Sequence, residues 1–363
     1  MSVHLTDDQQ DAMDQVLDWV KHRDSQHMTL GGYAGTGKTF CVKWLVEQIP
    51  GVRVLAPTGK ACQVLRRKGV EANTLHSWLY GAPDSIDWDG APVWGEPDPP
   101  DRPSFLIVDE ASMVEATIYA HLMGLRPRIR VLFVGDHGQL EPVGKNPELM
   151  KDPDVKLETI LRQNAESPIL RFAYRARTGM PLFEEADPEL TIAKPNGELT
   201  DLSFLYQFDQ VITYTNKRRQ ELNRLMRSTD TRLLQGDRVI CLRNHRSLCL
   251  YNGLIGRVTK VREDDTFDFV SDDDDERYYR HIRPSWDQFG AVKTLSETRH
   301  SIPLFDYAYA ITCHKAQGSE WESVLVVEDP QQWPMDRWRY TAITRAKSRL
   351  TFLSPRVRTK GPV

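Results

Sequence analysis

Short apolar runs alternate with amphipathic helical stretches along two parts of the chain, a pattern typical of α/β proteins. Each run is rich in β-branched or aromatic residues and is short enough to form a buried strand of a parallel sheet. The predicted strands are Met28–Leu30, Arg53–Leu55, Phe105–Val108 and Arg130–Val134, then Gln210–Thr213, Tyr307–Ile311, Val324–Val327 and Leu350–Leu353. The pattern therefore predicts two P-loop-like α/β cores in one chain.

Two intervals interrupt this alternation. The interval Gly81–Pro103 is rich in proline, glycine and aspartate, and it carries Trp88 and Trp94 on either side of an Asp-Gly pair, which is a strong tight-turn signal. It predicts either a short β-hairpin pin or an ordinary proline-rich surface loop. The interval Gly236–Pro303 predicts a small β-barrel inserted in the second core. Its expected strands are Asp237–Leu242, Ile255–Val261 and Thr266–Val270.

Composition narrows the class of protein. The chain has 363 residues, of which 40% are hydrophobic and 27% charged, as expected for a globular protein with at least two cores. Its apolar runs are too short to cross a bilayer. The five cysteines show no paired spacing, which argues against a zinc site or a disulfide framework and fits a reducing cytoplasm. The net charge of −4 hides a basic C-terminal segment, so charge does not exclude a nucleic-acid partner.

A complete GxxxxGK[ST] pattern runs from Gly32 to Thr39, after a predicted strand and at the start of a predicted helix. Its glycines allow backbone N–H groups to converge on phosphate oxygens at the helix N-terminus. Lys38 is expected to reach the β- and γ-phosphates, and the Thr39 hydroxyl to bind Mg²⁺. The pattern predicts an ATP–Mg²⁺ site whose loop includes Gly35, Thr36 and Gly37.

Polar side chains follow two further strands of the first core. Asp109 comes directly after an apolar strand and is expected to bind the metal, whereas the adjacent Glu110 is placed to activate the attacking water. Gln139 follows another strand and can orient water beside a γ-phosphate. Hydrolysis also needs positive charge on the transferred group, for which Arg162 and Arg345 are candidates beyond the first core. An isolated arginine, however, is more often a surface residue.

The order of these segments resembles that of superfamily 1 helicases, closest to the RecD-like and Dda-like proteins. The resemblance runs from residue 5 to about 350. It is carried by Leu5–Gln9, Gly32–Thr39, Ala56–Ala61, Asp109–Ser112, Gly135–Leu140, Leu161–Gln163, Ala310–Glu320 and Tyr340–Lys347. It implies two RecA-like domains, 1–150 and 151–363, with ATP between them and single-stranded DNA across the top. It also implies that Arg162 and Arg345 contact the γ-phosphate.

Further roles follow from the resemblance alone. Gln9 is expected to read the adenine edge, although Thr6–Gln9 also fits a helix capping box. Gly318 and Glu320 are expected near the nucleotide. The implied DNA contacts are Pro57, Thr58, Lys60, His76, Thr312, His314 and Lys315. Gly81–Pro103 and Gly236–Pro303 stand where the 5′-to-3′ branch carries a pin and an SH3-like insertion.

The resemblance implies an ATP-dependent DNA helicase that moves 5′-to-3′ on single strands and acts at junctions of single and double strands. A monomer is expected, in the cytoplasm of a bacterial or phage-infected cell, with a replication or recombination protein as a possible partner. Alternatives are a translocase that strips proteins without appreciable unwinding and a nucleotide-gated DNA-binding module. Glu110 and Arg345 argue against the second alternative, because a switch without hydrolysis needs neither.

Overall fold

A computed structural model describes most of the chain: residues 4–22, 25–81, 85–86, 92–93, 99–101, 103–125, 128–141, 147–161, 166–195, 199–227, 233–243, 245, 248, 250–272, 277–291, 302–329 and 335–358. The chain divides into two compact units. The first comprises residues 1–84 and 94–171, and the second residues 85–93 and 172–363. No helix among the described residues is both long and apolar enough to span a membrane.

The first unit is built on a six-stranded sheet in which every neighbouring pair is parallel. In sheet order the strands are β3 (Ala72–Thr74), β2 (Val52–Ala56), β6 (Phe105–Val108), β7 (Arg130–Gly135), β1 (His27–Gly32) and β8 (Val155–Leu157). The four strands predicted for this core are confirmed. All carboxyl ends lie at one edge of such a sheet, which is where α/β proteins bind ligands.

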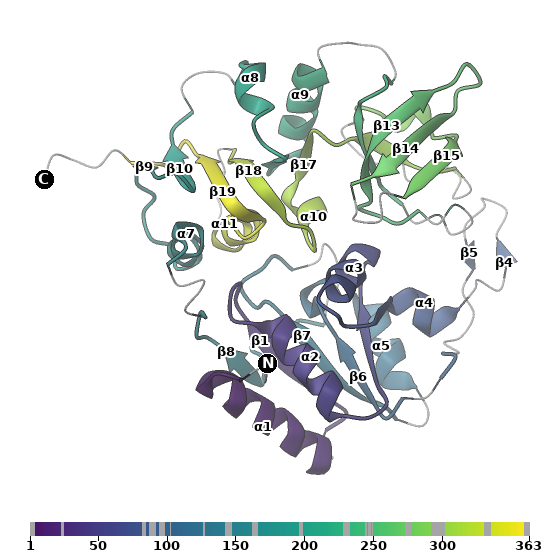
Figure 1. Ribbon diagram of the computed structural model, residues 1–363, viewed down its shortest axis with the longest axis vertical. Helices are drawn as coiled ribbons and strands as arrows, with labels where there is room; N and C mark the ends of the chain where they lie inside the picture. The colour runs from purple at the N-terminus through teal and green to yellow at the C-terminus, as the bar shows by residue number, and fades with distance from the viewer. Residues whose placement is uncertain are drawn as a thin grey trace, which may run out of the picture. The chain divides into compact units, whose positions relative to one another are not determined.

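Helices cover both faces of this sheet (Figure 1). The unit contains α1 (Asp7–His22), α2 (Lys38–Gln48), α3 (Gly59–Arg67), α4 (Leu75–Tyr80), the 3-10 turn η1 (Ala111–Met113) and α5 (Ala116–Gly124). Strand side chains alternate between the two faces. Ile107 packs with α1, α2 and α3, whereas Leu106 and Val108 pack with α4 and α5. The continuous apolar strands of the sequence are therefore explained by burial on both sides.

The second unit contains another six-stranded sheet, parallel except for one edge pair. Its strand order is β17 (Ala310–Thr312), β11 (Gln210–Thr213), β18 (Trp321–Val327), β19 (Ala346–Leu353), β10 (Leu190–Ala193) and β9 (Glu185–Ala186). Its helices are α8 (Leu202–Leu205), α9 (Asn216–Arg227), α10 (Cys313–Ala316) and α11 (Asp336–Ile343), and α7 (Pro168–Arg177) leads in from the first unit. Two α/β cores in one chain are thus confirmed.

A separate antiparallel sheet of five strands occupies the predicted insertion. In sheet order it comprises β15 (Tyr278–Ile282), β14 (Phe267–Ser271), β13 (Ile255–Val261), β12 (Arg238–Cys241) and β16 (Phe305–Tyr307), and the 3-10 turn η3 (Trp286–Gln288) follows β15 in the chain. Its aromatic core includes Phe267, Phe269 and Phe305. All three strands predicted here are present.

The predicted single strand Tyr307–Ile311 is wrong, because it is two strands of two different sheets. Tyr307 ends β16, which is antiparallel to β12, and Ala310 begins β17, which is parallel to β11. The change of partner falls between Ala308, whose N–H still donates to the Arg238 carbonyl of β12 (2.9 Å), and Tyr309, whose carbonyl accepts the Val211 N–H of β11 (3.4 Å). The Asn223 side chain binds the backbone of Tyr307 and Ala310 on either side.

Two other expectations concern the bounds of the first unit, which leaves out residues 85–93 and continues past residue 150. The interval Gly81–Pro103 contains the short antiparallel pair β4 (Ser85–Ile86) and β5 (Pro92–Val93), and Trp88 and Trp94 lie outside the described residues. The first unit continues past the expected boundary at residue 150, because β8 pairs with β1 and completes the sheet.

Candidate nucleotide and nucleic-acid sites

The loop between β1 and α2 has the backbone that a phosphate cradle requires. Gly35 and Gly37 have φ values of 83° and 86°, in the left-handed region that L side chains rarely adopt. At Gly32, a Cβ atom would come within 2.7 Å of the Thr36 hydroxyl oxygen and 3.0 Å of Lys38 Cγ. The loop therefore closes tightly only with glycine at these positions, and the residues present fit a bound nucleotide phosphate.

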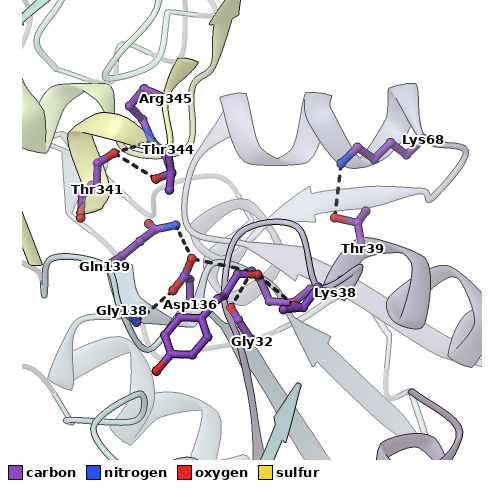
Figure 2. Close-up of polar contacts among 12 residues, drawn as sticks. Gly32, Lys38, Thr39, Lys68, Asp136, Gly138, Gln139, Thr341, Thr344 and Arg345 are labelled. Atoms are coloured by element: carbon purple, nitrogen blue, oxygen red, sulfur yellow. Dashed lines mark hydrogen bonds and ion pairs between the residues drawn. The ribbon is translucent and has the colours of Figure 1, made fainter. Parts of the chain in front are cut away.

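Lys38 lies at the mouth of this loop. Its ammonium donates hydrogen bonds to the carbonyls of Gly32 (2.7 Å) and Tyr33 (3.0 Å), and Nζ lies 3.8 Å from a carboxylate oxygen of Asp136 (Figure 2). Asp136 is almost fully buried at the end of β7, the strand adjacent to β1. The lysine charge is thus held at the carboxyl edge of the sheet.

The expected metal ligands lie at the same edge. Thr39 is in the first turn of α2, and its hydroxyl accepts a 3.5 Å hydrogen bond from Lys68 (Figure 2). Asp109 follows β6, and burial raises the pKa of its carboxyl above the ordinary value, opposed by the charges of Lys38 and Lys68. One hydroxyl and one buried carboxylate fit Mg²⁺, which keeps several waters and uses few protein ligands besides phosphate.

Glu110 has an unusual backbone conformation for a non-glycine residue. Its φ of 53° is left-handed, and its carbonyl accepts the Met113 N–H (2.9 Å) in the turn η1. Such a conformation costs of order 1–3 kcal/mol and is found mostly at functional sites. The backbone therefore leaves the direction of β6 immediately after Asp109, and the two adjacent acidic residues, Asp109 and Glu110, differ in backbone conformation.

Gln139 is oriented by Asp136, a residue that the sequence analysis did not select. Asp136 accepts the Gly138 N–H (2.9 Å) through one oxygen and the Gln139 side-chain amide (3.4 Å) through the other (Figure 2). Gln139 is 6% exposed, and among the described residues its amide oxygen has no hydrogen-bond partner. A buried acceptor normally has one, so this oxygen is suited to a water or ligand. The available signal was a second carboxyl directly after a strand.

Gln9 forms the capping box and also contacts the phosphate loop. The Thr6 hydroxyl accepts the Gln9 N–H (3.3 Å), and the Gln9 amide oxygen accepts the Thr6 N–H (3.1 Å). The side-chain amide also donates to the Thr36 carbonyl (3.0 Å). The capping box is therefore confirmed, and one amide N–H of Gln9 has no part in these three bonds.

Leu161 directly precedes Arg162, which was expected beyond the first core, and Leu161 lies in the first unit. The Leu161 N–H donates to the carbonyl of Gly35 in the phosphate loop (3.1 Å), which places this segment in the first unit. Arg162 itself lies outside the described residues.

Arg345, in the second unit, is 4% exposed and fully engaged by its neighbours. Its guanidinium donates to the carbonyls of Thr341 (3.0 Å) and Ser319 (3.2 Å) and to the Thr344 hydroxyl (3.0 Å). Figure 2 shows the contacts with Thr341 and Thr344 at the end of α11. Arg345 is therefore a buried side chain with a fixed position in the second unit, and not a solvated surface arginine.

The other expected residues of the second unit cluster around α10. Thr312 is buried at the end of β17 and precedes the helix. His314 and Lys315 are half-buried within it, and burial lowers the pKa of both side chains. Gly318 has a φ of 72° just after the helix, and Glu320 is exposed before β18.

The expected DNA contacts of the first unit follow β2 and β3. Pro57 and Lys60 are half-buried where β2 leads into α3, and the Thr58 hydroxyl caps that helix by accepting the Ala61 N–H (3.1 Å). His76 is half-buried in α4, with its ring 5.8 Å from that of Tyr80. These residues therefore lie at the carboxyl edge of the sheet. Thr58 also stabilises the start of α3 as its N-cap.

Family comparisons agree with this arrangement of elements. Residues 4–190, just over half of the chain, match a family described as an AAA domain. Residues 307–353 match a UvrD-like helicase C-terminal domain. The first match spans the phosphate loop, Asp109 and Gln139, and the second spans α10 and Arg345.

Among curated relatives, the chain is 29% identical to the ATP-dependent RecD2 DNA helicase of Deinococcus radiodurans, over 95% of this chain and 48% of the relative. It is 26% identical to the ATP-dependent DNA helicase Dda of Enterobacteria phage T4, over 65% of this chain and 60% of the relative. The chain thus spans about half to three fifths of the length of these relatives.

Among solved structures, the chain is similar to Pif1 helicase from Bacteroides in complex with ADP-AlF3 and single-stranded DNA. The TM-score is 0.58 at 19% identity, covering 97% of this chain and 92% of that one. A structure of Pif1 helicases at forked duplex DNA has a TM-score of 0.59 at 21% identity, covering 96% and 92%. The chain therefore belongs to the family described as an AAA domain. Its sequence is similar to the RecD2 and Dda helicases, and its fold to that of Pif1.

Proposed function

We propose that this chain is an ATP-dependent DNA helicase that translocates 5′-to-3′ on single-stranded DNA. The observation that carries the proposal is the set of groups at the carboxyl edge of the first sheet. The phosphate loop, Lys38, the Asp109–Glu110 pair and the Asp136–Gln139 contact occupy the ends of three adjacent strands, β6, β7 and β1. A binding module without hydrolysis has no use for a water-orienting group beside a cation.

In this proposal the loop of Gly35, Thr36 and Gly37 binds the phosphates, and Lys38 neutralises charge on the β- and γ-phosphates. Thr39 and Asp109 hold Mg²⁺, which supplies charge neutralisation when bound. Glu110 accepts the proton of the attacking water, and the Gln139 amide oxygen, which has no hydrogen-bond partner among the described residues, helps to orient that water. Gln9 contacts the adenine through its remaining amide N–H, and Gly318 and Glu320 lie near the nucleotide.

We propose Arg162 and Arg345 as contacts of the transferred phosphoryl group. Arg345 now donates to two carbonyls and one hydroxyl, so it would exchange at least one of these hydrogen bonds for a phosphate oxygen. The guanidinium is charged in both sets of bonds, but a phosphate also carries negative charge and can accept two parallel N–H bonds, whereas a carbonyl or hydroxyl is neutral, which favours the exchange. The two units would act as two RecA-like motor domains.

For the strand, we propose contacts from Pro57, Thr58, Lys60, His76, Thr312, His314 and Lys315. Hydroxyl, amide and ammonium donors bind phosphates without reading the sequence, so any single strand should serve. The five-stranded antiparallel sheet acts as the SH3-like insertion, and the β4–β5 pair as the pin. RecD2 and Dda carry the name DNA helicase, and the Pif1 structures hold single-stranded or forked DNA, which supports this substrate class.

A second reading is a translocase that strips proteins from single strands without appreciable unwinding. It needs the same ATP and strand sites, and the β4–β5 pair favours the helicase, because a short hairpin can serve to separate strands. Replacing Trp88 and Trp94 by Ala should lower duplex opening and leave DNA-stimulated hydrolysis intact.

The test is ATP hydrolysis with and without single-stranded DNA, followed by unwinding of duplexes with a 5′ or a 3′ tail. Lys38→Ala should abolish hydrolysis. Lys43→Ala, an exposed lysine on the same helix, is the matched control and should change nothing. Opening of the 5′-tailed duplex alone supports the proposal. Stimulated hydrolysis without opening supports the translocase, and hydrolysis that ignores DNA refutes both.

A further inference from the structure

Three polar side chains of α9 fasten the antiparallel sheet to the second α/β core. Arg219, Asn223 and Arg227 recur every four residues and therefore share one face of the helix. Arg219 forms a buried ion pair with Asp306 of β16 and donates to the Ala291 carbonyl (2.8 Å). Arg227 donates to both carboxylate oxygens of Asp237, just before β12.

Asn223 fixes the link between the two sheets. Its amide donates to the Tyr307 carbonyl (3.3 Å) and the Ala310 carbonyl (2.9 Å), and its oxygen accepts the Ala310 N–H (2.8 Å). Because β17 leads directly into α10, the position of α10 relative to the antiparallel sheet is set by these contacts. The insertion and α10 therefore form one structural piece of the second unit.

A turn of the antiparallel sheet reaches Lys315 on α10. Tyr251 accepts the Leu254 N–H (3.1 Å), and Gly253 between them has a φ of 90°, which suits glycine. The turn is held to β12, because Cys241 accepts the Gly253 N–H (2.9 Å) and donates its own N–H to Leu254 (2.8 Å).

The exposed Asn252 of this turn accepts a 2.9 Å hydrogen bond from the Lys315 ammonium through its amide oxygen. This contact differs from the arginine contacts nearby. Arg219 and Arg227 are each neutralised by a carboxylate, whereas the partner of Lys315 is a neutral amide. Among the described residues, no carboxylate acts on the Lys315 charge. Its electrostatic neighbours are Cys241 and Arg219, and burial lowers the pKa of the ammonium.

A partly buried ammonium whose hydrogen-bond acceptor is an uncharged amide keeps its positive charge available for an anion from outside the chain. We propose that Asn252 is a positioning residue, which orients the Lys315 ammonium toward a backbone phosphate of a bound single strand without neutralising it. This inference rests on the proposed function, and it gives the inserted sheet an indirect part in strand binding, through the position of the Lys315 ammonium. An aspartate at position 252 would instead form an ion pair with Lys315 and compete with the phosphate.

The test is the salt dependence of binding to a labelled oligothymidylate, since each phosphate neutralised on a single strand contributes about 0.7 to the slope of log K against log salt concentration. Asn252→Asp and Lys315→Gln should each reduce the slope by about 0.7. Asn252→Ala is the matched control: it keeps the lysine charge and should keep the slope while lowering affinity a few-fold. In the Lys315→Gln background, Asn252→Asp should change the slope less than it does in the wild type.

Thermal unfolding of each variant and nucleotide binding without DNA separate a folding defect from a binding defect. Asn252 is exposed and aspartate is well tolerated in turns, so the unfolding midpoints should match the wild type. A wild-type slope in Asn252→Asp, or an equal reduction in Asn252→Ala, would overturn the inference while leaving the proposed function intact. If the wild-type chain fails to bind the oligonucleotide, the proposed function itself fails.

Discussion

Asp136→Asn is the substitution that most directly tests the arrangement around the phosphate loop. The Asp136 carboxylate orients the Gly138 N–H and the Gln139 amide, and it lies 3.8 Å from Lys38 Nζ. Asparagine keeps one acceptor oxygen, so one of the two hydrogen bonds survives. Its amide nitrogen then faces other donors: the Gln139 amide and the Lys38 ammonium in one orientation, or the Gly138 N–H in the other.

The expected loss can be worked from these contacts. A hydrogen bond to a charged group contributes about 1.5–3 kcal/mol, against about 0.5–1.5 kcal/mol for a neutral one. One bond is weakened and the other is lost, so the free energy that holds Gln139 in its orientation should fall by roughly 1.5–3 kcal/mol. If Gln139 orients the attacking water only in the transition state, kcat should fall about ten- to hundred-fold, because about 1.4 kcal/mol is a factor of ten.

The assay is steady-state ATP hydrolysis at saturating single-stranded DNA, with the KM for ATP measured in the same series. The KM should change little, because the phosphate loop itself is untouched. Asp152→Asn, at an exposed aspartate paired with Lys156, is the matched control and should behave as wild type. A kcat within twofold of wild type in a folded Asp136→Asn protein would refute the role given to this carboxylate.

Four further outcomes are expected. Gly37→Ala should weaken ATP binding at least tenfold in a titration, since φ is 86° and the new Cβ would lie 2.4 Å from the Gln9 amide nitrogen. Asp109→Asn should abolish Mg²⁺-dependent hydrolysis, yet raise the free energy of unfolding in urea near neutral pH. This gain is expected because burial raises the pKa of the Asp109 carboxyl in the folded state. The folded state is penalised at pH values above that folded-state pKa, and it gains stability as pH falls toward the pKa of the unfolded chain. Arg219→Met should lower that free energy by about 3–5 kcal/mol, because it leaves Asp306 buried and unpaired; a loss under 1 kcal/mol would contradict this. The pKa of His314 is lowered by burial, so the unfolded state takes up the proton first and stability is lost below about pH 6.5. His314→Gln should flatten that part of a pH series of thermal unfolding.

Local patterns in the sequence determined the nucleotide half of the site. The phosphate loop depends on glycine conformations within eight residues, and the carboxyl residue Asp109 and the amide residue Gln139 follow strands that alternation and apolarity alone reveal. The capping box of Thr6 and Gln9 is likewise local, since its two hydrogen bonds join residues three apart. Such features need no knowledge of the fold, because chain connectivity brings the groups together.

Contacts between distant segments were decided only by the tertiary structure. Gln9 binds Thr36, 27 positions away, and Lys315 binds Asn252, 63 positions away. The continuous apolar run Tyr307–Ile311 divides between two sheets because Asn223 on α9 binds the backbone on both sides of the break. An apolar run records burial, not the partner strand that causes it. Contacts between distant side chains leave no spacing in the sequence, so the approach of Asp136 to Lys38 and the hydrogen bond between Lys315 and Asn252 are decided only once the sheets have formed.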